Sequence, residues 1–153
     1  MGTNITFCGS GFLGIYHIGV VSCLKTHAQK LLDKIERCGG CSAGALAACM
    51  LACNLDLEAG IQFVINQSSM VRKSVLGPFY KDFSKNIRES CSKSLPLDAY
   101  KRASGRLFIS LTRVSDLKNV VVSEYKSNED LIDVSLKIFV SFVYVGKQSP
   151  SYI

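Results

Sequence analysis

The chain reads Gly9-Ser10-Gly11-Phe12-Leu13-Gly14 directly after one short β-type run, and Gly40-Cys41-Ser42-Ala43-Gly44 directly after a second. In the second stretch, glycines on both sides of Ser42 permit a tight strand-to-helix turn that exposes the hydroxyl at the top of a sheet. In the first stretch, glycines let the backbone approach a ligand closely and direct N–H groups at negative charge. Together the two stretches predict an acyl-transfer site, with Ser42 as the nucleophile and residues 9–14 as the oxyanion loop.

Apolar spacing and turn signals outside these stretches predict alternating strands and helices. We expect strands at 4–8, 35–38, 107–111 and 120–125, and helices at 14–27, 43–53, 57–70, 82–91 and from 131 onward. Asp56 and residues 127–130 are expected to cap the helices that follow them, and Gly77-Pro78 breaks the pattern. The alternation predicts an α/β fold, a three-layer α/β/α arrangement around a largely parallel sheet. The chain shows no repeat or linker, so we expect a single domain over residues 1–153.

Composition is that of a folded globular domain: 153 residues, with 48% apolar and 20% charged side chains. The seven cysteines are odd in number and follow no recognisable signal peptide, which favours reduced thiols in the cytoplasm over a secreted disulfide framework. The charge-free run 38–55 is shorter than the ~20 residues that a spanning helix needs. We therefore expect a cytoplasmic chain that does not cross a membrane.

The net charge of +6 is concentrated in one segment. Residues 72–106 contain nine Lys or Arg against three Asp or Glu. Such an excess would favour an anionic surface such as phospholipid headgroups, although a solvated helical face is the commoner explanation. Aromatic residues of the kind that stack on bases do not accompany it, so nucleic acid is not an expected partner.

Three other interpretations of these motifs stay open. Residues 9–14 also match the Rossmann fingerprint, with Glu36 about twenty residues on, but Glu36 begins the second strand instead of ending it. Both glycine clusters would also suit close helix-on-strand packing without chemistry. Cys38 and Cys41 have the spacing of a redox pair. A zinc site would need a second ligand pair, and Cys49 and Cys53 are expected to face the core. Neither a metal nor a cofactor is expected.

Histidine placement narrows the type of hydrolase. The chain has only His17 and His27, and both precede Ser42. In α/β-hydrolases the histidine follows the serine and the acid. A triad in that order is therefore excluded, and a carboxylate becomes the expected base.

Four stretches of the sequence resemble a known family. Residues 4–14, 40–46, 103–107 and 110–114 are similar to the patatin-like phospholipase family, on the branch of adipose triglyceride lipase, and the likeness runs from about residue 4 to 133. The resemblance implies a patatin fold and a Ser-Asp dyad that hydrolyses triacylglycerol or phospholipid esters at a lipid-droplet or membrane surface. It matches Ser42 to the nucleophile and Gly9, Gly11 and Gly14 to the oxyanion loop, and it adds a protein coactivator to the expected partners.

The chain departs from that family at the base. The family aspartate stands in an Asp-Gly motif, and none of the six aspartates after Ser42 precedes a glycine. We therefore expect the chain to be the N-terminal part of a patatin-like acyl hydrolase domain, with a fold incomplete at its C-terminus and little activity alone. The alternative is a catalytically inactive patatin-like module that binds a lipid surface or a partner.

Overall fold

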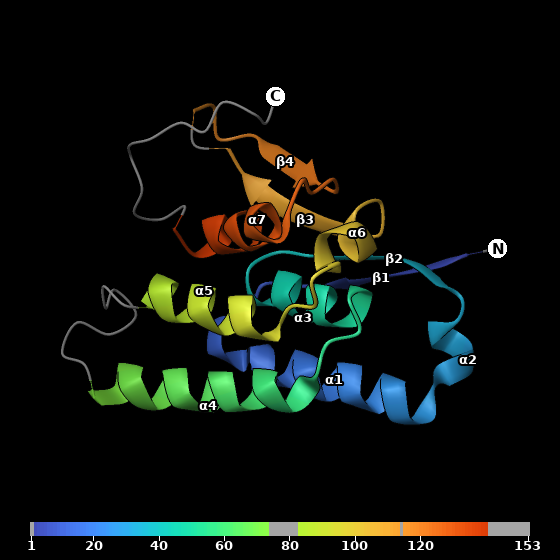
Figure 1. Ribbon diagram of the computed structural model, residues 1–153, viewed down its shortest axis with the longest axis horizontal. Coiled ribbons are helices and arrows are strands. Elements are labelled where there is room, and N and C mark those ends of the chain that lie inside the picture. Colours follow the sequence, from blue (N-terminus) through green and yellow to red (C-terminus); the bar gives the residue numbers. More distant parts are fainter. Residues whose placement is uncertain (1, 74–82, 114, 141–153) are drawn as a thin grey trace.

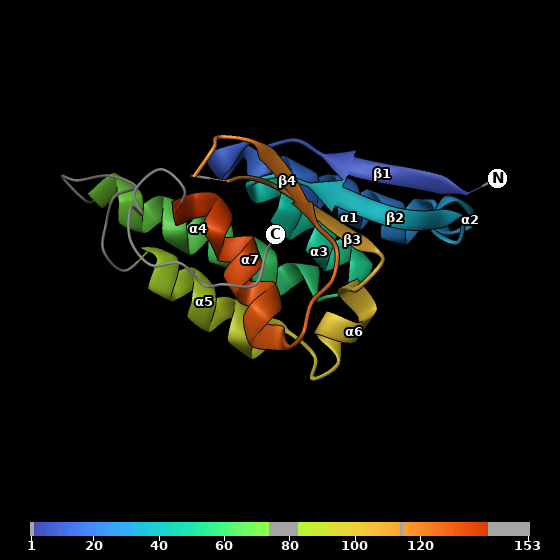
Figure 2. The same cartoon turned by 90° about the horizontal axis from the view of Figure 1, so that it is seen from above.

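The computed structural model describes residues 2–73, 83–113 and 115–140 (Figure 1). Its sheet has four strands in the order β1 (Thr3–Phe7), β2 (Ile35–Gly40), β3 (Leu107–Thr112) and β4 (Asn119–Val122). The first three strands are parallel, and β4 pairs antiparallel with β3. Figure 2 shows β1 and β2 running side by side in the same direction. The expected α/β class with a mostly parallel sheet is confirmed.

Helices connect and cover these strands. They are η1 (Gly11–Leu13), α1 (Gly14–His27), α2 (Gln29–Leu32), α3 (Ala43–Ala52), α4 (Leu57–Lys73), α5 (Phe83–Ser94), α6 (Ala99–Ala103) and α7 (Asn128–Val140). The expected caps are present, because Asp56 accepts the N–H of Glu58 and the hydroxyl of Ser127 accepts the N–H of Asp130. The break at Gly77-Pro78 lies outside the described residues.

One face of the sheet is packed and the other is open among the described residues. Cys38, Leu107 and Ile109 are fully buried, whereas Asn4, Thr6 and Val121, which alternate with buried or half-buried positions, are exposed. Successive parallel crossovers in one direction place their helices on the same face. The described residues thus form the sheet and the helices of one face, and they leave the third layer of the expected arrangement unfilled.

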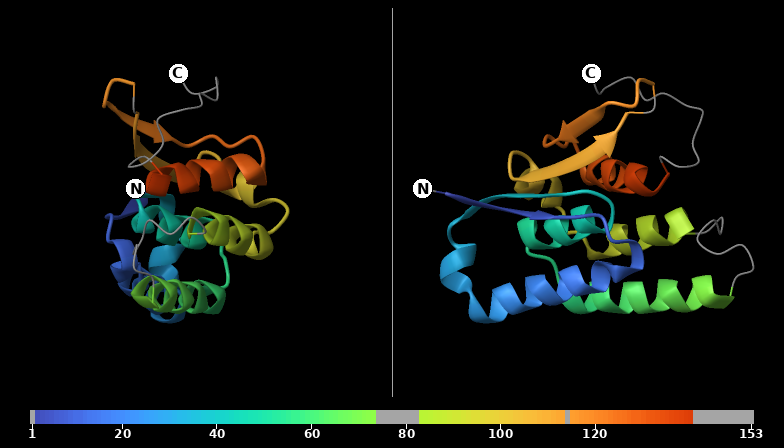
Figure 3. Two further views of the ribbon diagram at one scale, coloured as in Figure 1. Left: turned by 90° about the vertical axis from the view of Figure 1, so that its left-hand side faces the viewer. Right: turned by 180° about the vertical axis from the view of Figure 1, so that it is seen from behind.

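The core lies between the sheet and α3. Almost every residue of this alanine-rich helix is buried, since small side chains let it pack close to the strands. The further layer is formed by α1 and α4, which lie on the side of α3 away from the sheet (Figures 1 and 3). A second, smaller apolar cluster of Ile87, Ile132 and Leu136 joins α5 to α7.

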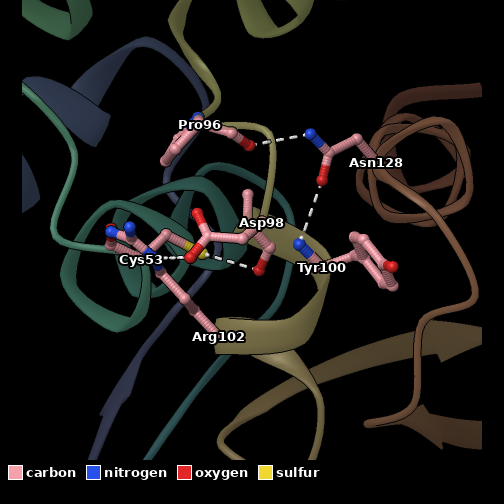
Figure 4. Close-up of polar contacts among 7 residues, drawn as sticks. Cys53, Pro96, Asp98, Tyr100, Arg102 and Asn128 are labelled. Atoms are coloured by element: carbon pink, nitrogen blue, oxygen red, sulfur yellow. Dashed lines mark hydrogen bonds and ion pairs between the residues drawn. The ribbon is translucent and has the colours of Figure 1, made fainter.

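Three elements differ from expectation, and one of them, the four-residue helix α2, lies where no element was predicted. The strand predicted at 120–125 ends at Val122, because Tyr125 turns into the core and its hydroxyl contacts the carbonyl oxygens of Leu107 and Val122 at 3.2 Å each. The short helix α6 was not predicted. Asn128 holds it in place: its amide donates to the carbonyl of Pro96 at 2.8 Å and its Oδ1 accepts the N–H of Tyr100 at 3.0 Å (Figure 4).

Arg102 links α6 to the end of α3. Its Nε donates to Asp98 Oδ2 at 2.9 Å, and its Nη1 donates to the carbonyl of Cys53 at 3.4 Å (Figure 4). A cation at the last carbonyls of a helix also interacts favourably with the helix dipole. These contacts fix the C-terminal end of the helix whose other end carries Ser42.

Candidate active site

Ser42 lies in the turn between β2 and α3, at the N-terminal end of the helix. Its backbone angles are φ 52° and ψ −134°, a region that glycine adopts readily and other residues rarely do. The residue is half-buried, and its side chain makes no capping hydrogen bond to α3. A strained serine between a strand and a helix is the geometry of a nucleophile elbow.

The loop 9–14 begins beside this turn because β1 and β2 are parallel neighbours. Phe7 pairs with Gly40 at the carboxyl ends of the two strands. The N–H of Cys41 donates to the carbonyl of Phe7 at 3.4 Å. The carboxyl ends of parallel strands share one edge of the sheet, which is where ligands bind in open α/β folds.

Glycines allow the close approach of the two segments. A Cβ on Gly9 would lie 3.4 Å from the Cβ of Ser42. A Cβ on Gly44 would lie 2.3 Å from the carbonyl oxygen of Phe7, and one on Gly40 would lie 2.5 Å from the backbone of Gly44. The last two distances are shorter than real Cβ contacts. Close packing, one of the interpretations left open by the sequence, is therefore present at Gly40 and Gly44, and it sets Gly9 beside Ser42.

Gly11 is needed for a different reason. Its φ is +55°, and a Cβ there would meet nothing within 4 Å, so the backbone conformation alone favours glycine. The preceding Ser10 has a buried hydroxyl without a hydrogen-bond partner among the described residues. Phe12 and Leu13 are exposed. The loop thus presents a glycine in the left-handed region and two apolar side chains at the edge of the site.

The N-terminal end of α3 contributes backbone donors. Ala43 occupies the first helical position, where a helix supplies no acceptor for the N–H group. Gly14, the first residue of α1, packs on it, since a Cβ on Gly14 would lie 3.0 Å from the Cβ of Ala43. The helix dipole adds positive potential at the same end. This arrangement suits a negatively charged oxygen between Ala43 and the loop 9–14.

His17 anchors the loop from α1. Its Nε2 donates to the carbonyl of Cys8 at 3.0 Å, and its ring meets that of Phe7 edge-on with the centroids 5.4 Å apart. A ring nitrogen that donates to a carbonyl does not at the same time accept a proton from a hydroxyl. His27, at the other end of α1, is exposed. Among the described residues, neither histidine makes a hydrogen bond to the Ser42 hydroxyl.

Every described aspartate after Ser42 has a partner of its own. Asp56 caps α4, Asp130 accepts the N–H of Lys126, and Asp98, Asp116 and Asp133 pair with Arg102, Arg113 and Arg88. Hydrogen bonds from these arginines lower the pKa of Asp98 and of Asp116, and a lower pKa makes a carboxylate a weaker base. The sixth, Asp82, lies outside the described residues. Within the part of the chain that the structure describes, no hydrogen bond to the Ser42 hydroxyl is found.

The dinucleotide-binding interpretation does not fit this geometry. Glu36 stands near the amino end of β2, where Thr3 pairs with Ile35, and the loop 9–14 follows the carboxyl end of β1. The ribose-binding acid of a Rossmann fold belongs at the carboxyl end. The glycine loop and Glu36 are therefore at opposite ends of the strands.

The cysteine motifs show no sign of redox or metal chemistry among the described residues. All seven cysteines are free thiols. Cys38 is fully buried, and burial raises its pKa, which makes it a poor nucleophile. Over residues 2–73, 83–113 and 115–140, no cluster of three or more His, Cys, Asp or Glu side chains is arranged to hold a metal ion.

Part of the basic excess at 72–106 is used inside the molecule. Lys85 lies 4.0 Å from Glu89, Arg88 pairs with Asp133, and Arg102 pairs with Asp98. The side chains of Arg72, Lys73 and Lys81 lie outside the described ones. The described pairs agree with a solvated, internally paired helical face.

An apolar pocket lies among α3, α4, α5 and α7. Leu46, one helical turn after Ser42, lines it together with Phe63, Ile87 and Cys91. Ser42 itself is not among the lining residues. Sequence reasoning missed this pocket because its walls come from helices far apart in the chain.

Comparison with known proteins identifies the family. The Patatin-like phospholipase family matches residues 5–136. The chain belongs to the patatin-like phospholipase family. The geometry expected of Ser42 in this family, a strand-to-helix turn beside the glycine loop, is present, while the catalytic roles of the site residues stay a prediction.

Curated relatives of this family match almost the whole chain. It is 46% identical over 151 residues to patatin-like phospholipase domain-containing protein 2 of Rattus norvegicus, covering 97% of this chain and 31% of that protein. It is 39% identical over 151 residues to omega-hydroxyceramide transacylase of Mus musculus, covering 97% of this chain and 25% of the relative. It is 37% identical over 154 residues to 1-acylglycerol-3-phosphate O-acyltransferase PNPLA3 of Homo sapiens, covering 99% of this chain and 32% of the relative.

The chain thus spans about a third or less of the length of these relatives. No solved structure matches it. Among the helices of the described residues, none has both the length and the hydropathy that a membrane span requires.

Proposed function

We propose that this chain carries the nucleophile and the oxyanion loop of a serine lipid acyl hydrolase or acyltransferase. The observation that carries the proposal is the placement of Ser42, strained at φ 52° at the start of α3 and set against Gly9. A patatin-like family match and relatives named as a transacylase and an O-acyltransferase support the choice of an acyl group.

In this proposal the Ser42 hydroxyl oxygen attacks the carbonyl carbon of a lipid ester. The carbonyl oxygen takes the negative charge beside the N–H of Ala43 and the N–H groups of the loop 9–14. The ester bond then breaks, the alcohol leaves with the proton, and an acyl group remains on Ser42. Water completes hydrolysis, or an acceptor hydroxyl completes transfer. The apolar pocket that begins at Leu46 suits the hydrocarbon part of the substrate.

The proton of Ser42 needs an acceptor, and the proposal assigns this role to an aspartate in an Asp-Gly motif outside this sequence. The lowered pKa of Asp98 and Asp116 and the partners of the other described aspartates support that assignment. Loss of a base typically lowers the rate by ~10⁴-fold. The chain as given is therefore proposed to bind and react slowly without turnover, and the whole enzyme to act on triacylglycerol or phospholipid at a cytoplasmic lipid-droplet or membrane surface, with a protein coactivator.

The test compares three proteins: this chain, its Ser42→Ala variant, and a chain extended through the next Asp-Gly. A fluorophosphonate probe should label the first and third at Ser42 and leave the variant unlabelled. A short-chain ester should be turned over by the extended chain alone. Turnover by the unextended chain that Ser42→Ala abolishes would show that a base is already present. Absence of labelling and turnover in all three would favour the inactive binding module.

A further inference from the structure

Helix α1 is apolar on two faces, and one of them is uncovered among the described residues. The buried residues of the helix are Gly14, Ile18 and Val21, and they pack toward α3 and α4. On the other face Tyr16 is 71% exposed and Val20 is 46% exposed, and Leu13, just before the helix, is 62% exposed. Spacings of three and four residues put these side chains on one helical face. We call Leu13, Tyr16 and Val20 the outer stripe.

A surface helix normally turns a polar face to water. The outer stripe instead presents three large apolar side chains in succession, and contiguous apolar surface of this kind marks an interaction site more often than scattered single residues do. No charged side chain of α1 lies beside the stripe, because its exposed neighbours on the same helix are Gly19 and Cys23. A feature other than water is therefore expected to cover the stripe.

The stripe is continuous with the candidate active site. It begins at Leu13, within the loop 9–14 whose first glycine lies against Ser42. His17, between Tyr16 and Val20 in sequence but turned inward, ties the same helix to the carbonyl of Cys8 at the start of that loop. Whatever covers the stripe therefore also lies at the rim of the site.

Charge on this part of the chain favours a lipid surface. No Asp or Glu occurs before Asp33, so negative side chains of α1 would not repel anionic headgroups. Residues 1–32 instead contain two lysines, Lys25 and Lys30, so this part of the chain is net positive, although the Lys25 Nζ is part-buried and donates to the carbonyl of Leu55 at 2.9 Å. Tyr16 has the amphipathic ring that is enriched at membrane–water interfaces.

We propose that the outer stripe docks the protein on a lipid surface, with Tyr16 and Val20 entering the boundary between headgroups and acyl chains. Docking there places the loop 9–14 against the lipid, so that an ester reaches Ser42 without crossing bulk water. The inference rests on the proposed function for its choice of lipid as occupant, and it adds the surface through which the site meets its substrate.

Tryptophan fluorescence tests the proposal directly, because the chain contains no tryptophan. A Tyr16→Trp variant carries a single reporter on the stripe. The matched control is Leu97→Trp, since Leu97 is 95% exposed in the loop between α5 and α6, away from α1 (Figure 2). With phosphatidylcholine–phosphatidylserine vesicles, we expect a blue shift for Tyr16→Trp and quenching by brominated acyl chains, with neither effect for Leu97→Trp. No shift in Tyr16→Trp, or equal shifts in both variants, would overturn the proposal.

Vesicle co-sedimentation gives a second, independent readout. The double variant Tyr16→Glu/Val20→Glu should lose at least tenfold in vesicle partitioning, because a carboxylate is costly to bury among lipids. Leu97→Glu should bind as the parent does, and circular dichroism checks that both variants are folded. If the double variant does not fold, the tryptophan experiment decides. A blue shift in Tyr16→Trp that grows with protein concentration without vesicles would show that a second copy covers the stripe, and the proposal would be wrong.

Failure of this inference can be told from failure of the proposed function. Ser42→Ala should bind vesicles like the parent, and the double variant should still be labelled at Ser42 by a soluble fluorophosphonate. If the parent is labelled at Ser42 but does not bind vesicles, the docking proposal is wrong and the proposed nucleophile is supported. If the parent binds vesicles but is not labelled, the proposed nucleophile is wrong and the docking proposal is supported.

Discussion

A side chain on Gly9 would bring its Cβ within 3.4 Å of the Cβ of Ser42. The two residues belong to loops after different strands, and they meet because β1 and β2 are parallel and paired up to Phe7 and Gly40. The same pairing sets the N-terminal end of α3 against the loop, with Gly44 beneath the carbonyl of Phe7. The site is thus built by strand pairing and completed by glycines that permit close contact.

Ser42 is predicted to limit the stability of the fold. At φ 52° and ψ −134° the backbone of a residue with a Cβ is strained, at a cost on the order of 1–3 kcal/mol. Ser42→Gly removes this strain and Ser42→Ala keeps it, so the glycine variant should be more stable than the alanine variant by about 1 kcal/mol after the larger unfolded-state entropy of glycine is counted.

Urea unfolding of both Ser42 variants measures this difference. Ser68 in α4 serves as the control, because it is an ordinary helical serine whose hydroxyl donates to the carbonyl of Val64. There the order should reverse, with Ser68→Gly less stable than Ser68→Ala by about 1 kcal/mol. The same order at both positions would contradict a strained elbow.

Two helical glycines should respond oppositely to alanine. A Cβ on Gly44 would lie 2.3 Å from the carbonyl oxygen of Phe7, whereas a Cβ on Gly19 would meet nothing within 4 Å. We expect Gly44→Ala to destabilise the protein by about 3 kcal/mol through overpacking. Gly19→Ala should stabilise it by about 0.5–1 kcal/mol, since alanine has the better helix propensity. Thermal unfolding followed by circular dichroism measures both, and a tolerated Gly44→Ala would show that α3 can move away from β1.

Asn128 is predicted to be the main polar link between α6 and α7. Both ends of its amide are used, by the carbonyl of Pro96 and the N–H of Tyr100. Asn128→Ala would leave both groups unpaired in a half-buried place and should cost about 2 kcal/mol. Asn119 is the control, because it is an exposed residue whose Oδ1 accepts a hydrogen bond from Ser110, and Asn119→Ala should change the free energy of unfolding by less than about 0.5 kcal/mol. If the two variants lose the same free energy of unfolding, Asn128 is not the main polar link between α6 and α7.

Local sequence patterns predicted the helices and strands whose own residues show a clear apolar period or turn signal. The helix Gly14–His27 was expected with the same bounds, since an apolar period begins at a glycine loop. The helices Gln29–Leu32 and Ala99–Ala103 are too short to show a period and were missed. Tyr125 belongs to a β-type run but leaves the strand for hydrogen bonds to Leu107 and Val122, and such tertiary contacts are not visible in the run.

The candidate site could likewise be predicted from local patterns only in part. The position of Ser42 at a turn could be predicted, because two glycines and a following helical period flank it. Its approach to Gly9 depends on parallel pairing, which the alternation of strands and helices only favours. The antiparallel direction of β4 was not predicted, although the short link from Thr112 to Asn119 excludes the crossover that a parallel strand needs. The apolar pocket combines four helices, and no local pattern carries that information.

Cys91 provides a pH-dependent prediction. Burial raises its pKa to about 11, well above the ~8.5 of a free cysteine. Since the thiolate is the reactive form, alkylation of Cys91 by iodoacetamide should be slow at pH 8 and should rise about tenfold per pH unit up to pH 10. Free cysteine under the same conditions should level off above its own pKa.

Stability should follow the same titration. The native state keeps the Cys91 proton to higher pH than the unfolded chain does, so this residue lowers the free energy of unfolding as the pH rises from about 8.5 toward 11. Cys91→Ala should therefore lose less stability over that range than the parent. Mass spectrometry of the alkylated peptide separates Cys91 from the other thiols. An alkylation rate that levels off below pH 9 would mean that Cys91 reacts through an opened state with an ordinary pKa, and burial in the native pocket would then not control its reactivity.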